Sequence, residues 1–200
     1  RIRLQRAVPD DEVAFGVLLA HEAWHRIQPD IGFPASEAAN AHLATERGRV
    51  LMRLEMRALA TALRSRGRGE RRAMRDALVL RAARQAAFPG ARLQEAALER
   101  NEGLASYTGV RLGAGDSALD YALRTLDGFD DRASLVRSFA QATGPAYGLL
   151  LDRVRPGWRS ELGPSAPADA LFATVRPPGA SAGEVGRATA RDGGGRASAE

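Results

Sequence analysis

Apolar side chains recur at helical spacing along most of the chain up to residue 154. Between residues 11 and 27 they occupy positions 13, 14, 17, 18, 20, 24 and 27, and apolar residues at 15, 19 and 23 widen the stripe. This pattern predicts a helix over 11–27 that is buried on most of its sides. The helix should end at 28–34, QPDIGFP, because two prolines and a glycine cannot continue it.

Similar spacing predicts five more helices. The longest covers 36–66, with Ser36 as its N-terminal cap, and a second over 70–87 follows the glycine-rich break at 67–69. Together these two helices should form a long helical hairpin over 36–88. The remaining helices are predicted over 91–107, 116–127 and 131–154.

The two ends of the chain carry different patterns. Apolar residues at alternate positions predict a short strand over 1–8, and the apolar segment 170–175 is predicted to dock as a last turn or strand. From 177 onward the chain is rich in Gly, Ala, Ser, Arg and Pro, which predicts a disordered tail over 177–200. The fold is therefore predicted to be mainly α, with one domain over 1–176.

The composition excludes several kinds of chemistry. The chain has no cysteine, which excludes disulfides, thiolate zinc fingers and cysteine nucleophiles. All 29 basic residues are arginine, so a Schiff-base lysine and a phosphate-loop lysine are excluded as well. No apolar run approaches the roughly 20 residues that a membrane helix needs, so no transmembrane segment is expected. These features fix neither the compartment nor the oligomeric state.

Positive charge is concentrated in the predicted hairpin. Residues 47–84 hold twelve arginines against three acids, Glu55, Glu70 and Asp76. Such a basic hairpin can meet nucleic acid or an anionic membrane. No recognition motif or aromatic stacking platform accompanies the arginines, so a solvated helix surface is the favoured interpretation and no nucleic-acid partner is expected.

The strongest chemical signal is the sequence His21-Glu22-Ala23-Trp24-His25, an HExxH motif. Residues four apart lie on one face of a helix, so both imidazoles can bind one Zn²⁺ ion. Glu22 stands beside them and can act as the general base that takes a proton from the metal-activated water. The motif lies inside a predicted apolar helix, which is the setting that this chemistry requires.

A catalytic zinc ion needs a third protein ligand, which must come from elsewhere in the chain. The metzincin continuation is absent, because Gln28 and Ile31 occupy the positions of its glycine and its third histidine. His42 and several glutamates remain as candidates, and spacing alone does not separate them. The glutamates are Glu46, Glu95, Glu99 and Glu102.

The segment 101–107, Asn-Glu-Gly-Leu-Ala-Ser-Tyr, resembles the third-ligand motif of the glutamate zincins, or gluzincins. This class of zinc metallopeptidases includes the thermolysin and aminopeptidase families. The resemblance implies Glu102 as the third ligand, with Asn101 and Gly103 as its motif neighbours. Glu102 lies seventy-seven residues after His25, much further than in those families, so the hairpin over 36–88 is interpreted as an insertion. Glu46 has the family's usual spacing but lacks the motif.

Gluzincins commonly stabilise the developing oxyanion with a tyrosine or histidine from a later helix. This chain has three tyrosines, Tyr107, Tyr121 and Tyr147. We favour Tyr147, because Gly144 and Gly148 on either side would allow close approach to a metal centre.

Taken together, the sequence predicts a zincin-like helical core that binds one Zn²⁺ ion through His21, His25 and Glu102. The expected function is hydrolysis of a peptide or protein substrate, with Glu22 as the general base. One alternative is a non-catalytic helical binding domain that retains the zinc site. The other is a basic adaptor that binds nucleic acid or membrane through residues 47–84.

Overall fold

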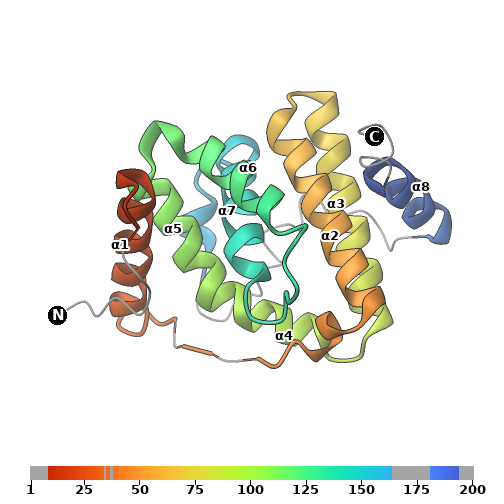
Figure 1. The fold of residues 1–200 in the computed structure, drawn as a ribbon, viewed down its shortest axis with the longest axis horizontal. Helices are drawn as coiled ribbons and strands as arrows, with labels where there is room; N and C mark the ends of the chain where they lie inside the picture. The colour runs from red at the N-terminus through yellow and green to blue at the C-terminus, as the bar shows by residue number, and fades with distance from the viewer. Residues whose placement is uncertain (1–8, 34, 37, 164–180, 194–200) are drawn as a thin grey trace.

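The computed structural model describes residues 9–33, 35, 36, 38–163 and 181–193, and these form a helical fold with no strand among them (Figure 1). The predicted mainly α class is confirmed. The segments 1–8 and 170–175, for which a strand or turn was predicted, lie outside the described residues. The α-helices are α1 (Glu12–Ile27), α2 (Glu46–Arg64), α3 (Arg68–Ala87), α4 (Ala91–Leu98), α5 (Leu104–Gly113), α6 (Ala118–Gly128), α7 (Phe139–Val154) and α8 (Ala182–Gly193). Shorter turns are the 3₁₀ segments η1 (Ala41–Ala44), η3 (Gly115–Ser117) and η4 (Trp158–Glu161) and the π-helical segment η2 (Glu99–Gly103).

Two helices begin later than their apolar spacing predicts. The helix expected from residue 36 begins at Glu46, because Asn40 adopts a left-handed backbone with φ of 44° and a 3₁₀ turn follows it. Thr45, and not Ser36, caps α2 by accepting a hydrogen bond from the Gly48 amide at 3.1 Å. The helix expected from residue 131 begins at Phe139.

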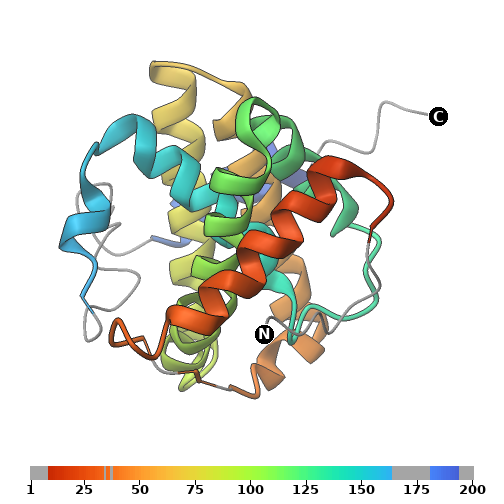
Figure 2. The same cartoon turned by 90° about the vertical axis from the view of Figure 1, so that its left-hand side faces the viewer.

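The arrangement of the helices confirms the predicted hairpin. Helices α2 and α3 lie side by side, and α7 packs between α2 and α5, near the centre of the molecule (Figures 1 and 2). The main core lies among these helices and includes Leu59, Leu80, Phe139 and Leu150, all fully buried. Helix α1 lies on the outside and packs against α5 (Figure 2). The HExxH helix is thereby brought onto the helix that follows Glu102.

Glycines allow the backbones of α1 and α5 to touch. A Cβ atom added at Gly113 would lie 2.2 Å from the carbonyl carbon of Gly16, and one at Gly109 would lie 2.7 Å from the Val17 carbonyl oxygen. Neither position can therefore accept a side chain without a shift of the backbone. This close approach lies one helical turn from His21, and there it fixes the distance between α1 and α5.

The tail prediction is wrong for residues 182–193, which form α8. Ser181 and Glu184 make a reciprocal capping box, in which each residue's backbone amide donates to the other's side chain. Ala188 is fully buried against the core, and Arg191 forms an ion pair with Asp76 of α3. The Gly- and Ala-rich composition hid this short apolar stripe and its cap.

The basic hairpin is partly neutralised by acidic residues in the folded protein. Two arginines of α2 reach carboxylates near the end of α6, since Arg57 pairs with Asp130 and Arg64 with Asp127. Two arginines of α3, Arg81 and Arg84, are buried and bind glutamates. This pairing reduces the positive surface on which the adaptor alternative depends. Among the described residues, no helix combines the length and the apolar character needed to cross a membrane.

Candidate metal centre

Three side chains from distant parts of the sequence converge in the fold. The Nε2 atoms of His21 and His25 lie 3.0 Å apart. Glu102 places one carboxylate oxygen 3.6 Å from Nε2 of His21 and the other 3.5 Å from Nε2 of His25. Within the described part of the chain, these three residues form the group whose ligand atoms are close enough together to hold a metal ion.

The spacing of the two histidine nitrogens and the Glu102 carboxylate is close to what a small tetrahedral ion needs. Zinc binds histidine nitrogen and carboxylate oxygen at about 2.0–2.2 Å, so two ligand atoms on a tetrahedral ion lie about 3.3–3.6 Å apart. The observed separations of 3.0, 3.5 and 3.6 Å fall around that value. Catalytic zinc sites also use such a donor set, which consists of histidine nitrogen and carboxylate oxygen and contains no sulfur.

Hydrogen bonds fix the orientation of both imidazole rings. Nδ1 of His21 lies 3.2 Å from Oγ of Ser106, and Nδ1 of His25 lies 3.2 Å from Oε1 of Gln28. The amide nitrogen of Gln28 donates to Asn101, so its oxygen is the atom that faces His25. His25 therefore donates through Nδ1 and keeps an Nε2 lone pair for a metal ion. Gln28, which marked the absence of a metzincin motif in the sequence, orients a ligand here.

Glu102 is oriented by amide groups. Asn101 donates to its Oε1 at 3.4 Å, and Gln141 of α7 donates to its Oε2 at 3.2 Å. Neither of these partners carries a positive charge, so neither forms an ion pair that would compete with a cation for the carboxylate. Asn101 thus donates a hydrogen bond to Glu102 beside it and accepts one from Gln28, the hydrogen-bond partner of His25.

A π-helical turn directs Glu102 toward the histidines. The Leu104 amide donates to the Glu99 carbonyl, five residues earlier, within the segment η2. In a regular α-helix, Glu99 and Glu102 would share one face. The wider turn separates them, so Glu99 binds Arg81 in the core and Glu102 faces α1. Sequence periodicity predicted a continuous helix here and missed the turn.

The π turn is held against α7 by a contact between glycines. A Cβ atom added at Gly144 would lie 2.4–2.7 Å from backbone atoms of Gly103. The residue after the proposed ligand therefore touches the backbone of α7 directly, which explains why small residues surround position 144.

Replacing Gly144 with alanine should disturb this contact. The added methyl group must push the π turn and α7 apart, so we expect a loss of about 1–3 kcal/mol of stability and weaker zinc binding. Urea unfolding and zinc titration measure the two effects. Gly128→Ala is the matched control, because nothing lies within 4 Å of its added Cβ. Equal behaviour of the two variants would contradict the role given to the contact.

The other predicted ligands lie elsewhere. Glu46 is exposed in the first turn of α2. Glu95 binds Arg84 and His42, whose Nε2 lies 2.7 Å from a Glu95 oxygen, and Glu99 binds Arg81. Among the candidates for the third ligand that the sequence left open, Glu102 is the one that lies beside the two histidines.

Tyr147 does not lie with the metal ligands. Its buried hydroxyl donates to Glu55 of α2 at 2.8 Å, and burial together with this carboxylate raises the pKa of Tyr147 well above its usual value. The small residues around it serve other contacts, since Gly144 meets Gly103 and Gly148 meets the ring of Tyr107. The oxyanion role predicted for Tyr147 therefore has no support in this geometry.

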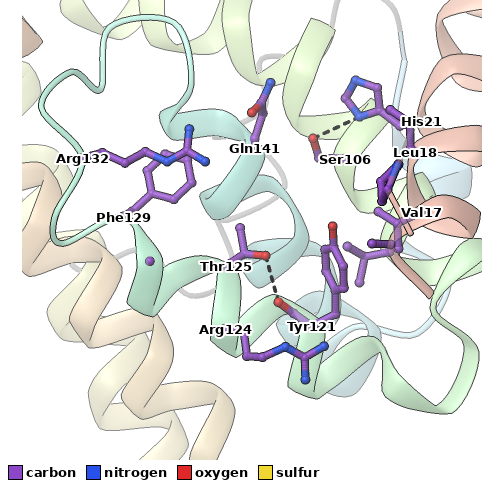
Figure 3. Close-up of a pocket in the computed structure, with 14 residues that line it drawn as sticks. Val17, Leu18, His21, Ser106, Tyr121, Arg124, Thr125, Phe129, Arg132 and Gln141 are labelled. Carbon is purple, nitrogen blue, oxygen red and sulfur yellow. Dashed lines mark hydrogen bonds between the residues drawn. The ribbon is translucent and has the colours of Figure 1, made fainter. Parts of the chain in front are cut away.

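A cleft of about 320 Å³ opens beside His21, one of the three candidate ligands (Figure 3). His21, Ser106 and Gln141 line it on the metal side, and apolar side chains of α1 and α5 form part of its wall. Tyr121 is the one tyrosine among its lining residues. The cleft, which sequence reasoning could not locate, gives a ligand space next to His21.

The chain matches no protein-family model, and comparisons with curated proteins and with solved structures gave no significant match. The class of the protein therefore has to be argued from the site itself.

Proposed function

We propose that the protein is a zinc-dependent peptidase of the gluzincin type. The observation that carries the proposal is the convergence of His21, His25 and Glu102 across seventy-seven residues of sequence. Two histidines on one helix and a carboxylate from another helix make a three-ligand set that leaves one position open on a four-coordinate ion.

The proposal gives each of these side chains a role. Zinc, when bound, supplies a Lewis acid that lowers the pKa of water and polarises a carbonyl group. Glu22 follows His21 on α1 and is partly buried, and within the described residues no ion pair occupies its carboxylate. Glu22 accepts the proton of the attacking water and passes it to the leaving amine. Ser106, Gln28 and Asn101 hold the ligands in place.

The adjacent cleft supports a peptide-sized substrate. It combines apolar wall residues with a few polar groups near the metal side, as substrate sites usually do. A non-catalytic binding domain with a zinc site would need no general base. The effect of replacing Glu22 therefore distinguishes a peptidase from such a binding domain.

Glu22→Gln provides the test. We expect the purified zinc-loaded protein to cleave members of a synthetic peptide library and the variant to lose at least about 100-fold in rate, because general-base catalysis contributes about 10²–10⁴-fold. Zinc content should stay unchanged, since Glu22 is not a ligand. Mass spectrometry of the library and metal analysis give both readouts.

Glu46→Gln is the matched control, because it removes an exposed carboxylate outside the site and should leave the rate unchanged. Bound zinc with no cleavage by the wild-type protein would favour the binding-domain alternative. Equal rates for the wild type and Glu22→Gln would contradict the proposed mechanism.

A further inference from the structure

We infer that the cleft selects peptides carrying a carboxylate group, for which Arg124 and Arg132 each offer a guanidinium group. This inference rests on the proposed function and names its substrate class. The carboxylate can be an acidic side chain or the C-terminus of the peptide, and both present the same group to a guanidinium.

The charge of the cleft is one-sided. Arg124 and Arg132 both line it, and no aspartate or glutamate appears among the described residues that do so. The remaining polar lining consists of His21, Ser106, Thr125, Tyr121 and Gln141. A cleft with two positive charges and no negative charge in its wall attracts an anionic ligand.

The two guanidinium groups have no acidic partner. Most other arginines near α6 are paired, as Arg57 is with Asp130 and Arg64 with Asp127. Within the part of the chain that the structure describes, neither Arg124 nor Arg132 forms an ion pair. Both are exposed, so their N–H donors remain available to a ligand.

Aromatic rings in the cleft hold both arginines. The Arg132 guanidinium lies 4.2 Å from the ring centroid of Phe129, and that of Arg124 lies 6.0 Å from the ring centroid of Tyr121. Stacking on a ring restricts the side chain and leaves the edge of the guanidinium free for bidentate binding of a carboxylate. Phe129 and Tyr121 both line the same cleft.

The arginines lie apart from the metal side of the cleft. Figure 3 shows Arg124 on α6 and Arg132 in the segment that follows it, at separate places along the cleft, whereas His21 and Ser106 lie on the α1 and α5 side. Val17 and Leu18 line the cleft on the same side as His21. A peptide in the cleft can therefore place a carboxylate on the arginines while another part of its backbone reaches the metal centre.

Peptide binding to the full-length, zinc-loaded Glu22→Gln protein tests the inference without requiring cleavage. The probes are four pools of tetramethylrhodamine-labelled octapeptides built from neutral residues. They carry one Glu or one Gln, each with a free or an amidated C-terminus. We expect the carboxylate-bearing pools to bind about tenfold or more tightly than the neutral amidated pool in fluorescence anisotropy. The Glu-amide and Gln-acid pools identify which carboxylate is bound.

The double variant Arg124→Gln/Arg132→Gln should lose this preference and keep its zinc. Arg68→Gln/Arg71→Gln is the matched control, because it removes the same charge from exposed positions of α3 outside the cleft. Equal binding of all four pools would overturn the inference, as would an equal loss in both double variants or no binding at all. Peptide binding tests this inference, whereas peptide cleavage tests the proposed function.

Discussion

Replacing Glu102 with alanine is expected to lower the zinc affinity by more than about 100-fold. Loss of a residue that merely orients a metal ligand costs about 10–100-fold, so loss of the ligand itself should cost more. Glu102 supplies the only carboxylate in the group, with oxygens 3.5 and 3.6 Å from the two imidazole nitrogens. Competition with a chromogenic zinc chelator measures the affinity of the variant directly.

Glu46→Ala is the control for this experiment. Glu46 has the sequence spacing that gluzincins use, yet it lies exposed on α2 outside the ligand group. Its removal should leave zinc affinity unchanged. A strong effect of Glu46→Ala combined with a weak effect of Glu102→Ala would reassign the third ligand.

The second large effect is expected at Arg84, which is fully buried between α2 and α4. Its guanidinium contacts Glu55 at 2.5 Å and Glu95 at 2.6 Å, and both carboxylates are fully buried. Burial opposes its charge, but the two glutamates outweigh burial and raise the pKa of Arg84. Arg84→Met would leave two buried carboxylates short of a partner, so we expect a loss of about 3–5 kcal/mol of stability in urea unfolding.

Arg64→Met is the comparison for Arg84. The Arg64–Asp127 pair is more than half exposed on the arginine side, at 51%, and its loss should cost less than about 1 kcal/mol. A loss below about 1 kcal/mol at Arg84 as well would mean that the buried glutamates find other partners or take up protons.

The buried charges also connect the core to the metal site. Arg81 binds Glu99 through two hydrogen bonds of 2.5 Å, and Glu99 begins the π turn that carries Glu102. Arg81 also lies 3.5 Å from Glu55, which binds Arg84 together with Glu95. The hairpin formed by α2 and α3 therefore supports the segment that carries Glu102.

Local patterns predicted much of this molecule. Apolar spacing located α1, α3 and α6 to within two residues of their ends, because each has a buried stripe and a clear break after it. The HExxH spacing and the Asn101–Gly103 motif named the three residues that converge in the fold. These features are local, so a sequence is sufficient to show them.

The remaining features depend on contacts between distant residues. The sequence predicts that the arginines of 47–84 form a solvated surface. Arg81 and Arg84 are instead buried, because glutamates from α2, α4 and η2 surround them. The glycines beside Tyr147 suggest from the sequence that this tyrosine lies near the metal. In the structure these glycines contact Gly103 and Tyr107 instead. Sequence spacing could not show which partner fills the space beside a small residue.

The central claim is that two imidazoles and one carboxylate bind a single zinc ion. X-ray absorption at the zinc edge, recorded on the full chain with one equivalent of metal, tests it most directly. We predict two imidazole nitrogens at about 2.0–2.1 Å, the remaining ligands being oxygen, with one nitrogen lost in His25→Ala. Zinc that fails to bind, that is coordinated without histidine, or that binds His25→Ala unchanged would contradict the account.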